Sequence, residues 1–226
     1  MGRIIIQQET VKNPISLIGK EAGVCWGADI EDPKKNYKRG LSCMASGHGR
    51  TMEFPDVYMI VDGYSARVIR ELYTHIGGSP TRLQASTRYI DYEHGFSYVT
   101  PPSIANDFKK QSIYEAAMDH IALALRNLED LGTPREDSAL LLPLGMTTKV
   151  VLKINARTLT DMSRQRMCSR AYHEFRNLFN DIIEALSSYS TEWKEFCQLN
   201  FMPKCEYLGW CPEEKSCGRY GPKPEK

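Results

Sequence analysis

The spacing of apolar residues divides the chain into short strands and long helices. Strands are expected at 3–8, 57–61 and 149–154, because these segments are rich in β-branched residues and the last alternates apolar with mostly charged positions. Helices are expected at 65–75, 104–131 and 159–187, where apolar residues recur every three or four positions. A short helix is expected near 20–25. Strands and helices follow one another without a regular strand-helix-strand rhythm, which favours an α+β domain whose mixed or antiparallel sheet is flanked by long helices.

Two polar segments interrupt this pattern and are expected to be loops. Residues 31–40 (EDPKKNYKRG) are charged and contain Pro33 and Gly40, which predicts an exposed loop. Residues 77–80 (Gly-Gly-Ser-Pro) end the helix at 65–75 and lead into the polar segment at 84–89.

Composition and charge narrow the class of protein. The chain has 226 residues, of which 42% are hydrophobic and 25% charged, as in one globular domain. With 29 basic and 28 acidic side chains the formal charge is +1, so no overall field favours nucleic acid or an anionic membrane. No apolar stretch approaches ~18 residues. A cytoplasmic protein with no nucleic-acid or membrane partner is therefore expected, and the odd number of cysteines, seven, argues against a secreted disulfide framework.

The segment at 84–89 brings an amide, a hydroxyl, a cation and a phenol together. Gln84, Ser86, Arg88 and Tyr89 are suited to holding a phosphate and stacking on a ring, and Arg82 adds a second cation. An exposed turn with a surface arginine is the alternative.

A second anion site is expected at the junction between the strand at 149–154 and the helix at 159–187. Asn155 and Arg157 stand at this junction, and a helix N-terminus presents N–H groups and a dipole to an anion. Further along, Arg166, Arg170 and His173 share one helical face, which suits a phosphate or a uracil-like carbonyl unless the face is simply solvated.

Other candidate chemistry is weaker. No arrangement indicates a covalent nucleophile, and Gly47-His48-Gly49 lacks the rest of a dinucleotide fingerprint. Four cysteines lie near the C-terminus: Cys197, Cys205, Cys211 and Cys217. They lack the closely paired spacing typical of zinc sites, so no metal is predicted, and a zinc-binding tail remains the alternative.

Taken in order, these segments resemble the flavin-dependent thymidylate synthase family over about residues 20–187. The resemblance rests on the following parts: residues 22–26 (AGVCW), Gly47-His48 with Glu53, the Ser-x-Arg-Tyr segment at 86–89, Leu142-Pro143, the strand at 150–154, the Asn-x-Arg-x-Leu segment at 155–159 and the long helix after it. It implies a catalytic domain at 1–190, followed by a cysteine-containing tail at 191–226.

The resemblance also implies an activity and a set of site residues. The reaction would be the reductive methylation of dUMP to dTMP, with carbon from methylenetetrahydrofolate and hydride from FAD reduced by NADPH. The enzyme would be a homotetramer with active sites at subunit interfaces. Binding of dUMP is assigned to Gln84, Ser86, Arg88 and Arg166, with Arg166 as the catalytic residue at the uracil ring. Contact with FAD is assigned to His48, Arg50, His75, Asn155, Arg157 and Asp161.

This chain departs from the family in one motif. Where the family has Arg-His-Arg, this chain has Thr74-His75-Ile76, and Ala139 replaces a further arginine. An ungapped count from Ser86 instead aligns the motif with 76–78 and keeps none of it. Arg82 is the expected substitute cation for dUMP. Two alternatives stay open: a family paralogue acting on another pyrimidine nucleotide or transferring another one-carbon unit, and a non-catalytic nucleotide-binding protein with a zinc tail.

Overall fold

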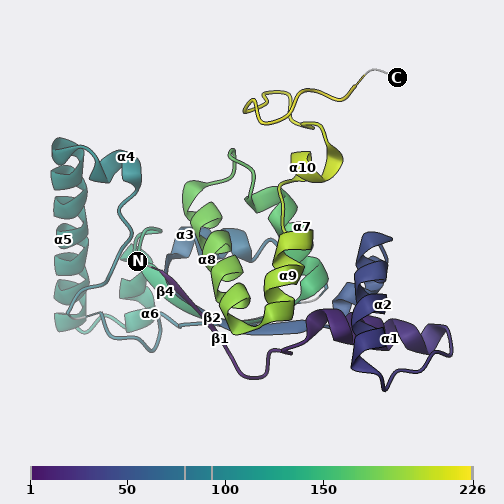
Figure 1. Cartoon of the computed structure of the whole chain (residues 1–226). Coiled ribbons are helices and arrows are strands. Elements are labelled where there is room, and N and C mark those ends of the chain that lie inside the picture. The colour runs from purple at the N-terminus through teal and green to yellow at the C-terminus, as the bar shows by residue number, and fades with distance from the viewer. Residues whose placement is uncertain (1, 79, 93, 225–226) are drawn as a thin grey trace. The chain divides into compact units, whose positions relative to one another are not determined.

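The computed structural model describes residues 2–78, 80–92 and 94–224 (Figure 1). The chain forms two compact units, each built from separate stretches of sequence. Unit 1 is made mainly of Asp62–Tyr73 and Leu83–Val150, and unit 2 of Arg3–Val61, Thr74–Arg82 and Val151–Lys226. The boundaries fall inside strands and loops and do not follow a single cut along the chain.

A small antiparallel sheet confirms the predicted α+β class. Its four strands lie in the order β1-β2-β4-β3. Every second residue along most of β2 and β4 is buried, as the alternation of side chains in a strand requires. The strand β3 was not expected from the sequence. The bounds are β1 Arg3–Ile6, β2 Asp56–Ser65, β3 Thr81–Gln84 and β4 Thr147–Asn155.

The expected loop at 31–40 is wrong, because most of it belongs to helix α2 (Pro33–Ala45). The Asp32 carboxylate caps this helix by accepting from the N–H groups of Lys34 and Lys35. Pro33, at the first helical position, has no N–H group that would need a partner. Helix α1 (Pro14–Cys25) begins earlier than the predicted 20–25.

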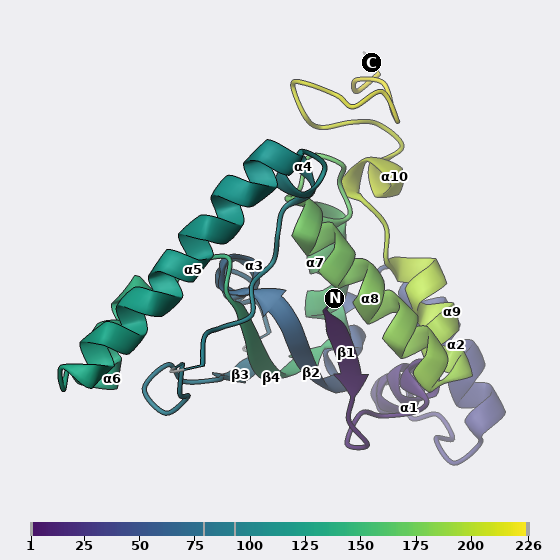
Figure 2. The same cartoon turned by 90° about the vertical axis from the view of Figure 1, so that its left-hand side faces the viewer.

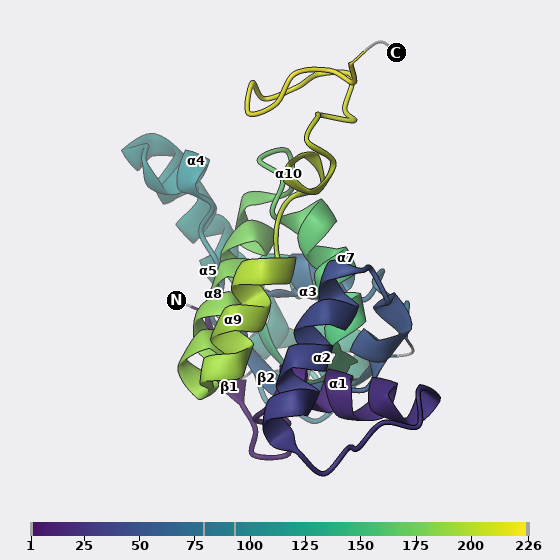
Figure 3. The same ribbon diagram turned by 45° about the vertical axis from the view of Figure 1, so that its right-hand side comes forward.

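The helices α1 and α2 pack at backbone distance and cross each other in Figure 3. A Cβ atom on Gly19 would lie 1.8 Å from the Asn36 carbonyl oxygen, and one on Gly40 would lie 2.0 Å from the Ile15 carbonyl oxygen. Only glycine allows this approach at either position.

The prediction of one helix at 159–187 is also wrong. The segment forms two helices, α7 (Ala156–Arg166) and α8 (His173–Tyr189). The Arg176 guanidinium donates to the carbonyls of Ser169 and, at 2.7 Å, of Ala171, so a side chain stabilises the turn between them. Arg166, Arg170 and His173 therefore do not share one continuous helical face.

Helix α9 (Thr191–Asn200) follows α8 directly and lies beside it (Figure 1). Its Trp193 and Phe196 side chains are fully buried, and the Glu192 carboxylate accepts from the Ser16 N–H at 2.9 Å and its hydroxyl at 2.6 Å. The predicted boundary at residue 190 thus falls between two helices of unit 2. The short helix α10 (Lys204–Leu208) leads into the irregular tail.

Unit 1 contains the long helix α5 (Phe108–Asp130), seen lengthwise in Figure 2. The helix predicted at 104–131 is interrupted, because Asp107 caps α5 and separates it from α4 (Pro102–Ala105). The buried residues of α5 are Met118 and Leu125, one position away from the expected stripe, and Leu125 joins a small core. The described part of unit 1 also contains helices α3 (Ala66–Leu72) and α6 (Arg135–Ser138) and the 3-10 helix η2 (Ala139–Leu141).

Candidate functional site

The junction between β4 and α7 lies at the centre of the site in unit 2. Asn155 is the N-cap of α7, and its side-chain oxygen accepts from the Thr158 N–H at 2.8 Å. The Thr158 hydroxyl lies 2.7 Å from the Gly77 carbonyl oxygen and 2.9 Å from the Asn155 side-chain oxygen. The Asn155 side chain thus has a structural role as well as the predicted ligand-binding one.

The loop at 77–78 packs against this helix N-terminus. Gly78 has φ +69°, and a Cβ atom there would lie 2.4 Å from Asn155 Nδ2 and 2.6 Å from Thr158 Oγ1. Both the backbone conformation and the close approach therefore require glycine. Ser79, the third residue of the predicted loop, lies outside the described residues.

A polar pocket of about 440 Å³ opens between this loop and α7, and is named here the α7 pocket. It gathers four of the six residues assigned to FAD from the sequence: His75, Asn155, Arg157 and Asp161. None of the other lining residues was assigned to a ligand from the sequence: Glu53, Thr74, Ile76, Gly77, Gly78, Thr158 and Gln165. Of these, Thr158 could have been recognised from the sequence, because a polar residue three positions after an N-cap commonly takes part in hydrogen bonds at the helix N-terminus.

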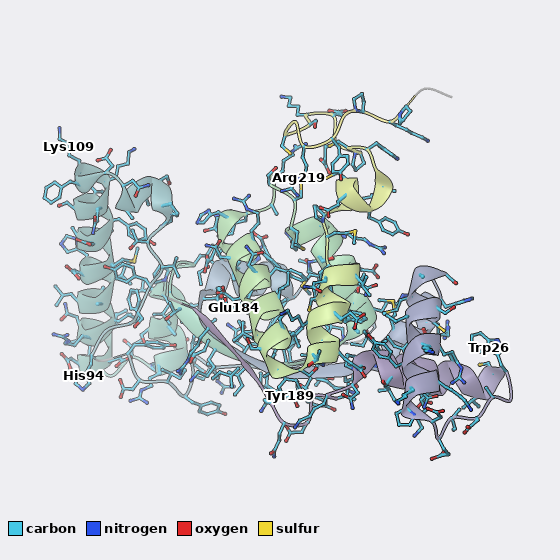
Figure 4. All side chains as sticks on the ribbon, viewed as in Figure 1. Trp26, His94, Lys109, Glu184, Tyr189 and Arg219 are labelled. Carbon is cyan, nitrogen blue, oxygen red and sulfur yellow. The ribbon has the colours of Figure 1, made fainter. Side chains whose placement is uncertain are left out.

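Arg157 connects the α7 pocket to a second one. Its Nη1 atom lies 2.5 Å from Glu53 Oε1, and both residues also line a hollow of about 900 Å³, named here the Trp26 pocket. The other two residues assigned to FAD, His48 and Arg50, line this hollow with Trp26 and Phe54. Trp26 is 60% exposed, beyond the end of α1 (Figure 4). All six predicted flavin residues thus line two pockets that share Arg157 and Glu53.

Arg166, the predicted catalytic residue, contacts the histidine of the altered motif. Its Nε atom donates to His75 Nε2 at 2.9 Å, and its guanidinium carbon lies 4.5 Å from the centre of the Phe175 ring. Burial, and then the Arg166 charge, lower the pKa of His75 from 6.5 to about 4. The imidazole is therefore neutral at pH 7, with Nε2 as an acceptor.

The residues assigned to dUMP other than Arg166 lie on or just after β3. Arg82 is half-buried within β3 and belongs to unit 2, whereas Gln84, Ser86 and Arg88 belong to unit 1. Arg88 Nε lies 2.8 Å from a Glu136 carboxylate oxygen, and both side chains are exposed. An anion that binds Arg88 therefore has to compete with this carboxylate.

Ser86 and Gln84 have local partners as well. The Ser86 hydroxyl oxygen accepts from the Arg88 N–H at 3.3 Å, which shapes the turn after β3. The Gln84 amide nitrogen donates to Thr148 Oγ1 at 3.3 Å, which ties β3 to β4 within unit 1.

The tail cysteines do not form the zinc set considered from the sequence. Cys197 is buried in the core, where desolvation raises the pKa of its thiol to about 12. The other three, Cys205, Cys211 and Cys217, line a pocket of about 500 Å³ together with Cys168 and Arg166, named here the thiol pocket. Within 2–78, 80–92 and 94–224, no three His, Cys, Asp or Glu side chains are placed to hold a metal ion.

The tail is anchored beside this pocket by Arg170. Its Nη1 atom lies 2.9 Å from a Glu213 carboxylate oxygen and 3.4 Å from the Lys215 carbonyl oxygen. A hydrogen bond from the Ser169 hydroxyl, followed by one from the Arg219 N–H, lowers the pKa of the exposed Cys217 thiol. Among the helices of the described residues, none is long and apolar enough to cross a membrane.

Comparison with known proteins identifies relatives along most of the chain. A family model described as thymidylate synthase complementing protein matches residues 6–189. The flavin-dependent thymidylate synthase of Geobacter sulfurreducens is 34% identical over 179 residues, which are 78% of this chain and 74% of that protein. The enzyme of the same name from Nitratidesulfovibrio vulgaris is 29% identical over 196 residues, 79% of this chain and 74% of that one.

Solved structures share the fold as well. ThyX from Helicobacter pylori, complexed with FAD and dUMP, has a TM-score of 0.67 at 16% identity and covers 85% of this chain and 98% of its own. The UMP/dUMP methylase PolB from Streptomyces cacaoi, bound with 5-Br dUMP, has a TM-score of 0.68 at 19% identity and covers 89% and 96%. At these identities the likeness establishes the architecture.

Proposed function

Because the chain belongs to the flavin-dependent thymidylate synthase family, we propose that it catalyses the reductive methylation of dUMP to dTMP. Methylenetetrahydrofolate gives the carbon in this proposal. The redox chemistry is supplied by bound FAD after reduction by NADPH. The observation that supports the proposal is the α7 pocket, because four of the residues assigned to FAD from the sequence line it.

The residues of the α7 and Trp26 pockets fit a flavin dinucleotide. The N-terminus of α7 and the Arg157 cation suit anionic phosphate groups, and the Asp161 carboxylate is an acceptor for hydroxyl groups. The exposed Trp26 and Phe54 rings suit stacking on a planar ring. We propose that five of these residues hold FAD across the two pockets, with His75 beside them: His48, Arg50, Asn155, Arg157 and Asp161.

Arg166 is proposed to act on the pyrimidine. As C5 of dUMP becomes nucleophilic, negative charge develops on the ring carbonyls, and a fixed guanidinium stabilises that charge. An arginine in this role makes a protein nucleophile unnecessary. Substrate binding is completed by Gln84, Ser86 and Arg88, with Arg82 taking the place of the missing motif arginines.

The assembly and the location follow from the family as proposals. A homotetramer with active sites at subunit interfaces would bring residues of different chains together, and a cytoplasmic enzyme would find its nucleotide and NADPH there. We also propose that the part shared with the family ends near residue 190 and that the cysteine-containing stretch at 191–226 extends it, with α9 packed into the core of unit 2.

Purified protein tests the proposal directly. We expect a yellow preparation that oxidises NADPH in response to dUMP and methylenetetrahydrofolate and forms dTMP, detected by mass spectrometry. Arg166→Ala should bind FAD but lose turnover by at least about 100-fold, as for removal of one transition-state donor. Arg135→Ala is the matched control, because Arg135 is an exposed arginine paired with Asp91 at 2.6 Å. A preparation that takes up no FAD would refute the proposal.

A second candidate is methylation of another pyrimidine nucleotide. It is favoured by the loss of both motif arginines at Thr74 and Ile76, and by the shared fold of the UMP/dUMP methylase. Parallel assays with UMP and dUMP separate the two, because only the ribose 2′-hydroxyl differs. Flavin-dependent turnover of UMP in excess of dUMP, together with failure to rescue a thymidine auxotroph, would favour this candidate.

A further inference from the structure

We propose that His75 is a positioning residue for Arg166, and that its neutral imidazole holds the guanidinium against the Phe175 ring in the orientation that meets the pyrimidine. This proposal rests on the proposed function, in which Arg166 contacts dUMP. It differs from the assignment by resemblance, in which His75 contacts FAD.

Arg166 needs such support because of where it lies. It is the last residue of α7, just before the turn at 167–172, so the following backbone does not continue the helix around it. An arginine side chain has many rotamers, and a cation that stabilises a transition state has to be fixed beforehand.

Contacts with His75 and Phe175 hold the guanidinium, and Arg166 Nη2 also lies 3.5 Å from Thr74 Oγ1. The 2.9 Å hydrogen bond from Arg166 Nε to His75 Nε2 sets the direction of the side chain. The guanidinium carbon lies 4.5 Å from the centre of the Phe175 ring, within the range of a cation–π contact. His75 is itself held by an edge contact with Phe175, with ring centres 5.9 Å apart and an angle of 62°. The three side chains therefore support one another.

The choice of histidine has an electrostatic consequence. A carboxylate in the same place would accept the same hydrogen bond but would neutralise the cation, which weakens its effect on developing negative charge. A neutral imidazole accepts the bond and leaves the charge on Arg166 intact. The low pKa of His75 is consistent with this state. Because Nε2 accepts from Arg166, the proton of the neutral ring is on Nδ1.

Substitutions at His75 separate positioning from flavin binding. His75→Leu removes the acceptor, and we expect kcat to fall roughly 10- to 100-fold while FAD affinity changes less than about threefold. His75→Gln keeps an acceptor oxygen and should restore kcat to within about fivefold of wild type. His120→Leu, at an exposed histidine of α5, is the matched control and should match wild type. A loss of FAD affinity in His75→Leu with kcat retained would overturn the proposal, as would equal losses of kcat in the Leu and Gln variants.

A measurement on the unaltered protein keeps the proposal testable if His75→Leu does not fold. ¹⁵N NMR of the histidine rings at pH 7 should give an unprotonated Nε2 and a protonated Nδ1 for His75. The opposite tautomer would refute the hydrogen bond. If wild-type protein bound FAD but never turned over dUMP, the proposed function would fail, while the tautomer would still report whether His75 accepts from Arg166.

Discussion

Replacing Gly78 with alanine tests whether the loop at 77–78 is held by its contact with the N-terminus of α7. An alanine at φ +69° costs about 1–2 kcal/mol in backbone energy alone. Its Cβ atom would also lie 2.4 Å from Asn155 Nδ2, so the loop has to lift and break the hydrogen bond between Thr158 and the Gly77 carbonyl, at about 1 kcal/mol. The expected loss of stability is therefore about 2–3 kcal/mol.

Thermal unfolding and FAD titration measure this loss. For a chain of this length the melting temperature should fall by roughly 4 to 12 °C, and FAD affinity should fall with it because the loop lines the α7 pocket. Gly77→Ala is a matched control one residue away, since its Cβ atom would meet nothing within 4 Å and its φ is not positive. Equal melting temperatures and FAD affinities for the two variants would refute the reasoning.

Three further predictions concern other contacts. The unfolded state protonates His75 near pH 6.5 and the folded state only near 4, so its contribution to stability is complete above pH 6.5 and is lost as the pH falls toward 4. Between pH 6.5 and 4, the free energy of unfolding measured in urea should fall by up to about 3 kcal/mol more for wild type than for His75→Gln. Parallel curves for the two proteins would contradict this prediction. Asp32→Ala should cost about 1 kcal/mol by removing the cap of α2, Asp32→Asn should restore most of it, and equal stabilities of Ala and Asn variants would argue against capping. Glu213→Gln should change global stability by less than about 1 kcal/mol, because its ion pair with Arg170 is exposed, but should speed amide exchange across 211–221; unchanged exchange would mean that this ion pair does not anchor the tail.

The sequence predicts elements well where one face is apolar and poorly where packing depends on backbone or polar contacts. The strands β1, β2 and β4 were predictable from their β-branched residues, and β4 also from its alternation of apolar and mostly charged positions. Helix α2 was missed because its buried residues are Asn36, Gly40 and Cys43, which form no apolar stripe, and because Pro33 at a helix start looks the same as a loop breaker. The turn between α7 and α8 contains neither glycine nor proline, and depends on the carbonyl contacts of Arg176.

The candidate site shows the same division. The junction at Asn155 was predictable because a strand followed by a capped helix has a local signature. The contact of Gly78 with Thr158 was not, because it joins residues 80 positions apart through a glycine conformation. Similarly, the family resemblance supplied His75 and Arg166 as separate ligand contacts, while the hydrogen bond between them appears only in three dimensions.

Unit 2 combines residues from both ends of the chain, and this order affects how the protein folds during synthesis. Strand β1, made of residues 3–6, packs against α8, and α1 packs against α9, so the earliest residues of unit 2 need partners made near the end of the chain. At about 5–20 residues per second, a ribosome needs roughly 10 to 30 s to make the residues between them. During that time the apolar faces of β1 and α1 have no partner from α8 or α9. We infer that unit 2 completes its core only after translation is nearly finished, and that a C-terminal truncation removing α8 and α9 leaves a nascent chain exposed to chaperones and proteases.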